Sequence, residues 1–570
     1  MRRNHLHNRT LPPWLPALAT ALALALGYNL PLWRRLLALP GVSLATAPGF
    51  LIATGIVLTA IFFAFFSLVS YPRILKPVLI LALFLAAPIA WFSASYGIVI
   101  DCHMISNILE TDLREAGELI TAGYLLYLFC FALLPALVIA RLQLSWRPAP
   151  RQTAGNLLLA FAALLTAGGA VYLNYSSFVL FGREHRDLRM FINPTYALYS
   201  AGKYYRQLHP EKVVLKAVAV DARIDPRQRP AGRHRLGLMV VGESARAIEF
   251  SLNGYPRPTN PELARETATS FTRAYASATS TAEALPCMFS RLRRSDYSVK
   301  KAATEENLLD ILKRVGVAVY WRDNNSSSKG VARRVAYHKI AAADVPAGRR
   351  PELVVNGEIY DEALLCGLPE IISQNPRRDI LIILHQRGSH GPAYYKRHPK
   401  KFTRFRPEYR GASPQSAPRR ELINAYDNTI LYSDWFLARC IRLLKKYAPR
   451  YDTFMFYMSD HGESLGEKGI YLHGLPWLMA PDEQKHIGAV VWLSDGLARA
   501  LGVSPAELRE TRDRRISHDW IFSSLLRLYG VETKAYEPQL DLFAVTRSPA
   551  RRTAQDFPAK FARRATKAVY

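Results

Sequence analysis

The hydrophobic and polar positions along the chain follow one pattern up to about residue 181 and another after about residue 234. The first part contains long apolar runs separated by short polar loops, and a membrane-spanning helix needs about 20 mostly apolar residues. The second part contains shorter apolar runs that alternate with amphipathic stretches. The first pattern predicts five transmembrane helices, at residues 14–33, 47–70, 77–99, 124–140 and 156–180.

The second pattern is typical of a mostly parallel β-sheet clad by helices, because strands that are buried on both faces appear as short, continuous apolar runs. Helical stretches between such strands provide the crossovers that parallel strands require. We therefore expect an α/β domain in the second part. Its strands are predicted at residues 236–241, 317–321, 380–385 and 453–458, and its helices at residues 305–315, 358–368 and 424–447.

Between the two patterns lies a segment in which Arg, Lys and Tyr residues interleave, and it ends in the Pro- and Gly-containing stretch 225–232. Basic and aromatic residues next to a membrane span are typical of helices that lie on lipid headgroups. We expect three parts in all: a five-helix transmembrane domain over residues 1–181, membrane-surface bridging helices and a linker over 182–234, and the α/β domain over 235–570.

The charges of the loops predict how the helices are oriented. The amino terminus and the loops at 71–76 and 141–152 carry eight Lys and Arg residues, whereas the loops at 34–46 and 100–121 carry three. Because positively charged loops stay in the cytoplasm, we expect a cytoplasmic amino terminus and an exported α/β domain. No small-residue cleavage site stands out after the first apolar run, which is therefore predicted to be a retained anchor.

The net charge of +28, from 74 Lys and Arg against 46 Asp and Glu, points to an anionic partner or surface. In a membrane-bound chain we favour phosphate-bearing lipid over nucleic acid, with an arginine-rich genome as the alternative explanation. The five cysteines are an odd number. Cys130 lies within a span and Cys102 at a membrane edge, so at most one disulfide could form among Cys287, Cys366 and Cys440.

The strand at 453–458 runs almost directly into Asp460, His461 and Gly462. Open α/β folds place ligands at the carboxyl ends of their strands, and adjacent oxygen and nitrogen donors suit Zn²⁺ or another divalent metal. Glu243 follows the strand at 236–241 in the same way and could complete the site. The alternatives are that Asp460 caps a turn, that His461 is an ordinary loop histidine, and that Glu243 interacts with a helix dipole.

A candidate nucleophile lies in Thr279-Ser280-Thr281, which precedes helix-compatible residues. Backbone N–H groups at a helix amino terminus favour a bound phosphate. A hydroxyl bound to a divalent cation loses its proton more easily, as does bound water, whose pKa falls to about 7. A threonine could then act as a nucleophile. The spacing leaves both threonines open, and a simple helix cap is the alternative role.

Other polar residues follow predicted strands in the same way. His390 lies in a glycine-containing turn after a strand, and His473 follows Asp460 by thirteen residues. Either histidine could bind a phosphate oxygen, protonate a leaving group or hold a second metal, although an isolated histidine is more often structural. The loop at 323–330 offers backbone amides and Lys329 to a phosphoryl group, with a plain polar loop as the alternative.

A polar stripe is predicted in the loop between the third and fourth spans. Asn107, Thr111 and Glu115 recur every fourth residue there, so on a helix they share one face beside the membrane. The alternative is the ordinary solvated face of a short helix.

Seven stretches connect these observations: Val240-Val-Gly-Glu-Ser-Ala-Arg246, Asn253-Gly-Tyr255, Leu285-Pro-Cys-Met-Phe-Ser290, residues 323–330, His390-Gly-Pro-Ala-Tyr-Tyr395, Ser459-Asp-His-Gly-Glu-Ser464 and Tyr471-Leu-His-Gly474. Together with the five spans, they resemble the bacterial lipid A phosphoethanolamine transferases. The resemblance covers nearly the whole chain. It implies an inner-membrane protein of Gram-negative bacteria with a periplasmic, alkaline-phosphatase-like domain, in a family that includes enzymes of polymyxin resistance.

The resemblance also implies a role for each candidate residue. The match at Pro286-Cys287 favours Thr281 over Thr279 as the nucleophile. The family's zinc ligands correspond to Glu243, Thr281, Asp460 and His461. Its phosphoethanolamine-binding or second-zinc histidines correspond to His390 and His473, and its substrate contacts to Asn325 and Lys329. A membrane-proximal triad that binds substrate corresponds to Asn107, Thr111 and Glu115.

The implied reaction is the zinc-dependent transfer of phosphoethanolamine from phosphatidylethanolamine to lipid A. It would proceed through a phosphoethanolaminyl-threonine, release diacylglycerol and confer polymyxin resistance. We expect a monomer with one tightly bound zinc, and leave a second zinc open. The alternatives within the superfamily are a core sugar or other glycan as acceptor, or a related membrane-bound phosphodiesterase or glycerolphosphate transferase.

Three other classes match less well. A sulfatase needs Cys/Ser-x-Pro-x-Arg at its nucleophile, which neither residues 281–285 nor residues 287–291 provide. Lipoteichoic acid synthases share five spans and a metal-bound threonine, but their motifs look less similar. A catalytically silent lipid sensor need not keep a nucleophile.

The sequence departs from the family pattern in its cysteines. The family usually carries a cysteine ten residues before the one that matches Cys287, and this position is Ser277 here. The paired cysteines expected around residues 356–368 and 405–422 are reduced to Cys366. The family's usual disulfides are therefore not expected.

Overall fold

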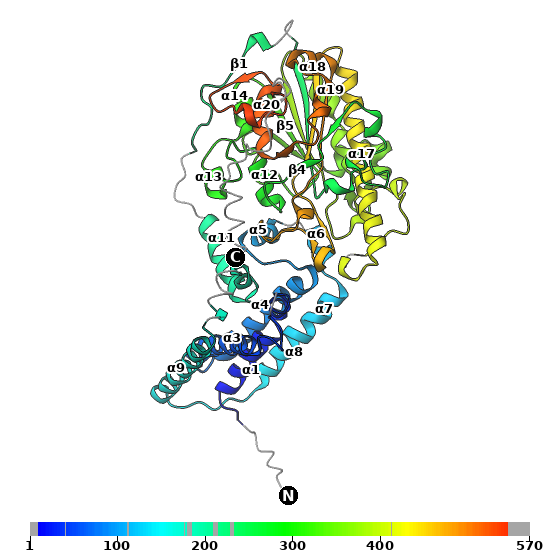
Figure 1. The fold of residues 1–570 in the computed structure, drawn as a ribbon. Coiled ribbons are helices and arrows are strands. Elements are labelled where there is room, and N and C mark those ends of the chain that lie inside the picture. The colour runs from blue at the N-terminus through cyan, green and yellow to red at the C-terminus, as the bar shows by residue number, and fades with distance from the viewer. Residues whose placement is uncertain are drawn as a thin grey trace. The chain divides into compact units, whose positions relative to one another are not determined.

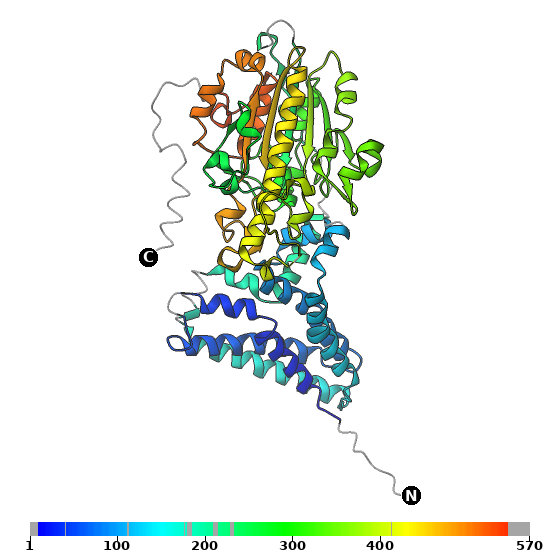
Figure 2. The same cartoon turned by 90° about the vertical axis from the view of Figure 1, so that its right-hand side faces the viewer.

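A computed structural model of the protein describes residues 10–39, 42–110, 113–175, 177–178, 185–208, 215–228, 233–411 and 413–544. The chain folds into two compact units (Figure 1 and Figure 2). Among the described residues, the membrane unit contains those up to Cys102 and those from Ile120 to Gly202, and the α/β unit contains those of His103–Leu119 and those from Lys203 to residue 544. The segment 103–119 thus belongs to the α/β unit, although in sequence it lies between two apolar helices.

The membrane unit contains long apolar helices. Among the described residues, four are long and apolar enough to cross a membrane, and a bent pair passes the same test together. Counting the pair as one span gives the five spans that the sequence predicts. The pair is α1 (Trp14–Leu26) with α2 (Leu30–Leu37), and the others are α3 (Pro48–Leu68), α4 (Leu75–Tyr96), the stretch Ala122–Arg141 and α9 (Ala149–Leu173).

The first span differs from the single helix that the sequence pattern predicts. α1 and α2 are bent by 44° across a break at residues 27–29, and Pro31 lies in the first turn of α2. Proline is tolerated in a first turn, where its missing N–H has no helical partner, but it cannot continue a preceding helix. A π-helical turn, η1 (Phe129–Leu133), likewise interrupts the stretch Ala122–Arg141 shortly before Pro135.

Small residues bring α3 and α9 together. Their contact includes Ala60 and Ala64 of α3 and Ala160, Ala163 and Ala167 of α9, all of them buried. In lipid there is little hydrophobic gain from bringing helices together, so close packing of small side chains supplies much of the attraction. The apolar runs therefore determine the spans, and the alanines within them determine which faces meet.

The α/β unit is built on a seven-stranded sheet with the strand order β3-β13-β10-β2-β9-β5-β6. The strands from β10 to β6 run parallel, and β13 runs antiparallel to both of its neighbours. This confirms the predicted mostly parallel sheet, with small shifts at the strand ends. The strands are β2 (Arg235–Gly242), β3 (Thr269–Ser270), β5 (Ala318–Asp323), β6 (Ala336–Lys339), β9 (Ile380–His385), β10 (Asp452–Ser459) and β13 (Ala489–Leu493).

Helices cover both faces of this sheet (Figure 1). In β2, Leu238 and Val240 belong to the hydrophobic core shared with α17 (Arg419–Tyr447), drawn in yellow in Figure 2. Met239 and Val241 belong to the other core, which includes residues of α14 (Leu308–Arg314) and α20 (Asp519–Leu528). Alternate residues of a strand point to opposite faces, so both sets are buried, and β2 is an unbroken apolar run for this reason.

One predicted helix is wrong. Residues 358–368 form β8 (Glu358–Ile359) and the 3₁₀ turn η10 (Asp361–Leu365), and α16 (Leu368–Ser373) begins only at their end. Gly367 has a left-handed conformation with φ 78°, which a right-handed helix cannot include, and Pro369 lies in the first turn of α16. The predicted helices at 305–315 and 424–447 correspond to α14 and α17.

Gly237 of β2 lies opposite Phe454 of β10, and a Cβ atom at Gly237 would lie 2.1 Å from Phe454 Cζ. We expect Gly237→Ala to lower the free energy of unfolding by about 1–3 kcal/mol, because the ring must move within a closely packed core. Gly348→Ala is the matched control, since no atom lies within 4 Å of its Cβ position. Thermal unfolding of the detergent-solubilised protein measures both changes. An unaltered melting temperature for Gly237→Ala would contradict this packing.

Candidate active site

The parallel strands place four chain segments at one edge of the sheet. In the register of β2, β10, β9 and β5, Gly242 lies opposite Ser459, and Asp323 lies opposite His385. Because these strands run parallel, the residues that follow them meet at the same edge. Glu243 and the Asp460–His461 pair follow two of these strands directly.

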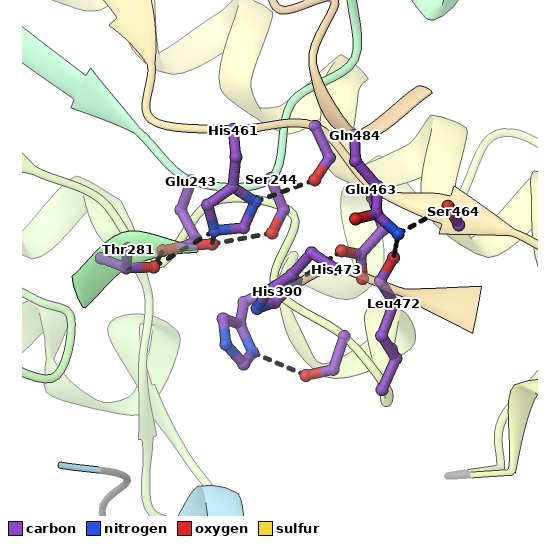
Figure 3. Close-up of polar contacts among 12 residues, drawn as sticks. Glu243, Ser244, Thr281, His390, His461, Glu463, Ser464, Leu472, His473 and Gln484 are labelled. Carbon is purple, nitrogen blue, oxygen red and sulfur yellow. Dashed lines mark hydrogen bonds and ion pairs between the residues drawn. The ribbon is translucent and has the colours of Figure 1, made fainter. Parts of the chain in front are cut away.

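Four predicted residues converge there and form what we call the threonine cluster: Glu243, Thr281, Asp460 and His461. Figure 3 shows three of them, Glu243, Thr281 and His461. The Thr281 hydroxyl lies 3.0 Å from Glu243 Oε2, to which it donates, and 3.2 Å from His461 Nε2. His461 Nε2 lies 3.4 Å from Glu243 Oε1 and 3.4 Å from Asp460 Oδ2. All four residues are buried.

Thr281 is the first residue of α12 (Thr281–Met288), and Ser280 holds the N-cap position. The N-cap position is thus taken by Ser280, and the Thr281 hydroxyl points to the cluster. Thr279 differs, because its hydroxyl donates to the Leu475 carbonyl oxygen (2.5 Å). Both threonines remained open as nucleophiles on spacing alone, and only Thr281 is in contact with Glu243 and His461.

Backbone contacts orient the donor atoms of the cluster. Asp460 Oδ1 accepts the backbone N–H groups of His461 (2.7 Å) and Ser244 (3.2 Å), whereas its buried Oδ2 has no hydrogen-bond partner among the described residues. His461 Nδ1 lies 2.8 Å from the Gly462 carbonyl oxygen. An N–H donated there leaves Nε2 as an acceptor that faces the cluster.

Gly388 lets a second loop approach Glu243. It has φ 50°, and a Cβ atom there would lie 2.7 Å from the Glu243 carbonyl oxygen. The Ser389 N–H donates to that same oxygen (2.9 Å). Only glycine combines this conformation with so close an approach, so the chain that leads to His390 is fixed against the cluster.

The electrostatics of the cluster favour a cation. Burial, together with the neighbouring Glu243 carboxylate, raises the pKa of Asp460 well above its usual range. Burial also lowers the pKa of His461 to about 3, so the imidazole is neutral and can act as a ligand. Two buried carboxyl groups share this neutral imidazole, and neither has a Lys or Arg partner in the part of the chain that the structure describes. Carboxylate, hydroxyl and imidazole donors are those that a divalent metal takes. The threonine cluster fits such an ion.

A second group of polar side chains adjoins the first. The imidazole rings of His461 and His473 lie 4.1 Å apart, and those of His473 and His390 lie 5.3 Å apart (Figure 3). His473 Nδ1 is 2.7 Å from Glu463 Oε2, and the Tyr394 hydroxyl donates to Glu463 Oε1 (2.7 Å). His461, Glu463 and His473 could also hold a metal ion.

Sequence reasoning did not assign a role to Glu463. Its side chain is buried, and it joins His473 to Tyr394. The available signal was its position three residues after Asp460, within the motif at 459–464. A carboxylate so close to a metal-ligand pair is a candidate for orienting a neighbouring histidine.

Asn325 also reaches the cluster. Its amide group donates to Glu243 Oε2 (2.8 Å) and to the Gln386 carbonyl oxygen (2.9 Å). Its backbone N–H donates to Asp323 Oδ1 (2.8 Å), and the other oxygen of Asp323 lies 3.1 Å from His385 Nδ1. Asn325 is thus held from both sides beside a proposed metal ligand. Lys329 lies four residues further along the same loop.

The predicted polar stripe is only partly described. Asn107 lies on α5 (Cys102–Glu110), and a Cβ atom at Gly474 would lie 3.9 Å from its Nδ2 atom. Asn107 therefore lies beside the residue that follows His473. Thr111 lies outside the described residues, and so does the side chain of Glu115.

All five cysteines have free thiols. At Ser277, where the family usually has a cysteine, the backbone N–H donates to His518 Nδ1 (3.0 Å). The other ring nitrogen of His518 lies 2.9 Å from the Ser459 carbonyl oxygen. The buried His518 thus joins the loop before Thr281 to the end of β10, and its pKa is lowered to about 4 by burial. Sequence reasoning did not identify this residue.

The chain is similar to known proteins over most of its length. A family model for sulfatases matches residues 235–531, and a family model described as phosphoethanolamine transferase EptA/EptB matches residues 58–208. Phosphoethanolamine transferase EptA of Escherichia coli K12 is 36% identical over 488 residues, which cover 84% of this chain and 87% of that protein. Phosphatidylethanolamine transferase Mcr-1 of Escherichia coli is 37% identical over 499 residues, which cover 85% and 89%.

Solved structures include a similar full-length protein. The integral membrane lipooligosaccharide phosphoethanolamine transferase A of Neisseria meningitidis superposes with a TM-score of 0.89 at 32% identity, covering 95% of this chain and 100% of that one. This confirms the predicted combination of membrane helices and an alkaline-phosphatase-like α/β domain.

Proposed function

This chain belongs to the EptA/EptB phosphoethanolamine transferases, and on that premise we propose that it moves phosphoethanolamine from phosphatidylethanolamine to lipid A. The contact of the Thr281 hydroxyl with Glu243 and His461, in a buried cluster at the carboxyl edge of the sheet, supports this most. A threonine at the start of a helix, beside carboxylates and an imidazole, is suited to attack phosphorus in a low-dielectric site.

The residues that would hold zinc are Glu243, Thr281, Asp460 and His461, as one tightly bound ion. When bound, zinc lowers the pKa of a coordinated hydroxyl and offsets the negative charge of a phosphoryl group. The unpartnered Oδ2 of Asp460 and the acceptor Nε2 of His461 fit this role without rearrangement of the backbone contacts. Asn325 keeps Glu243 in place.

The proposed reaction has two displacements. In the first, a bond forms between Thr281 Oγ and phosphorus, the bond from phosphorus to the glycerol oxygen breaks, and the threonine proton passes to a neighbouring acceptor. A proton from His390 or His473 completes the released diacylglycerol. In the second, a phosphate oxygen of lipid A forms a bond to phosphorus, the bond from phosphorus to Thr281 Oγ breaks, and Thr281 Oγ takes back a proton from the neighbouring acceptor. Lys329 contacts the substrate and offsets its charge.

The proposed setting follows from the spans and the loop charges. The protein is a multi-pass monomer of the Gram-negative inner membrane, with its amino terminus in the cytoplasm and its α/β domain in the periplasm. Residues 1–181 anchor it, residues 182–234 lie on the membrane surface, and residues 235–570 carry out the transfer. Asn107, Thr111 and Glu115 bind substrate beside the membrane. Modified lipid A carries less net negative charge, which weakens the binding of cationic polymyxin.

The test uses the purified protein and phosphatidylethanolamine with a fluorescent diacylglycerol moiety. We expect release of labelled diacylglycerol, and in cells that express the protein we expect lipid A heavier by one phosphoethanolamine group. Mass spectrometry of lipid A and of the core oligosaccharide distinguishes the acceptors. Unmodified lipid A with a modified core would assign the acceptor to a core sugar. Labelled diacylglycerol with neither modified would indicate a phosphodiesterase.

A further inference from the structure

The segment 103–119 contributes a buried acidic residue to the α/β unit. It consists of α5 and α6 (Leu113–Leu119), and it clusters with the α/β unit. The side chain of Glu118, on α6, is only 3% exposed. Acidic side chains are seldom buried to this extent unless they are paired.

The buried partner of Glu118 is Arg397, whose side chain is 1% exposed; Lys396, which is more exposed, bonds to the other oxygen of the same carboxylate. Arg397 Nη2 donates to Glu118 Oε2, and Nη1 donates to Glu358 Oε2 (3.2 Å). Its third nitrogen, Nε, donates to the backbone carbonyl oxygen of His390 (2.8 Å). The planar guanidinium group thus joins two carboxylates and one carbonyl oxygen in a fixed geometry, which a lysine ammonium could not do.

This series of contacts leads from Glu118 through Arg397 to His390, which lies near the threonine cluster. Its ring lies 5.3 Å from that of His473, which lies 4.1 Å from that of His461 in the threonine cluster. A bond to the His390 carbonyl oxygen fixes the backbone from which the imidazole projects. A shift of about 1 Å in a group that acts on a reacting bond can lower the rate by roughly 100-fold.

The same segment also reaches the loop of the second histidine. A Cβ atom at Gly474 would lie 2.7 Å from Met104 Cε and 3.9 Å from Asn107 Nδ2, both on α5. Gly474 directly follows His473. The segment 103–119 therefore contacts both histidine loops, one through α5 and the other through Glu118.

We propose that Glu118 is a positioning residue for the transfer: through Arg397 it holds the His390 loop against the threonine cluster. Without the Glu118 carboxylate, the buried guanidinium loses one of its two anionic partners and turns toward Glu358 or water, which weakens its bond to the His390 carbonyl oxygen. This inference rests on the proposed function, in which His390 serves the transferred group.

The test is a double-mutant cycle in the full-length protein, with release of labelled diacylglycerol as the readout. Glu118→Gln is expected to lower kcat by roughly 10- to 100-fold and to change KM little. In a His390→Ala background the same substitution is expected to lower kcat by less than about twofold, because both changes act on one group. A merely structural role would lower kcat by the same factor in both backgrounds, and that result would overturn the proposal.

Two further variants complete the design. Lys396→Gln is the matched control, since Lys396 Nζ bonds to the same carboxylate (Glu118 Oε1, 3.2 Å) but makes no described bond to His390. It is expected to keep kcat within about twofold of the wild-type value.

If thermal unfolding shows that Glu118→Gln does not fold, the cycle is run with Arg397→Lys, which keeps the charge and loses the planar set of donors. Wild-type protein that releases no diacylglycerol would overturn the proposed function, whereas active protein with independent effects would overturn this inference alone.

Discussion

Replacing Thr281 by alanine is expected to lower phosphoethanolamine transfer by roughly 1,000-fold or more, because the reaction loses the atom that forms the bond to phosphorus. The Thr281 hydroxyl is the one that contacts both Glu243 and His461. Thr281→Ser keeps a hydroxyl at the same position and should retain measurable transfer. The readouts are labelled diacylglycerol and mass spectrometry of the peptide that contains residue 281, which should carry a phosphoethanolamine group in wild type and none in Thr281→Ala.

Thr279→Ala is the matched control for this prediction. Thr279 is also a buried threonine, two residues earlier, but its hydroxyl donates to the Leu475 carbonyl oxygen and not to the cluster. We expect this variant to retain most of its transfer activity. Loss of transfer in Thr279→Ala together with normal transfer in Thr281→Ala would assign the nucleophile to the other threonine.

Removal of the metal is expected to have an effect of similar size. Chelation should reduce transfer to background, and added Zn²⁺ should restore it, because the cluster places two buried carboxyl groups beside a neutral imidazole with no Lys or Arg partner among the described residues. Asp460→Asn should lower the zinc affinity by at least roughly 100-fold, since residues that only support a ligand already cost 10- to 100-fold. Elemental analysis of the purified variants, alongside transfer rates, measures both.

Asp434→Asn provides the control for a buried aspartate that is not a ligand. Asp434 accepts the backbone N–H groups of Glu262 and Leu263, and burial raises its pKa to about 7, so an amide is a reasonable mimic of its protonated form. This variant should keep the wild-type zinc content. Wild-type zinc content in Asp460→Asn would show that the ion, if bound, is held elsewhere.

The strands at the centre of the α/β unit could be predicted because strands that are buried on both faces appear in the sequence as short apolar runs. β2 and β10 are buried on both faces, so each is an unbroken apolar run that ends at the first residues of the site. This position made Glu243, Asp460 and His461 candidates, since parallel strands bring their carboxyl ends to one edge, and the family resemblance then assigned them as zinc ligands. The segment 358–368 was predicted wrongly because its apolar residues suit a helix, whereas they form the strand β8 and the 3₁₀ turn η10, which the left-handed Gly367 separates from α16.

The sequence by itself determined the number of apolar spans, the class of the exported domain and the residue types of the threonine cluster, because hydrophobic periodicity and turn chemistry act over a few residues. Only the tertiary structure decided that the Thr281 hydroxyl, and not that of Thr279, contacts the cluster, that Glu463 joins His473 to Tyr394, and that Glu118 pairs with Arg397. The two residues of this last pair are separated by 279 positions. Contacts of this kind depend on how whole elements pack, and that packing leaves no periodic signal in the segments that it joins.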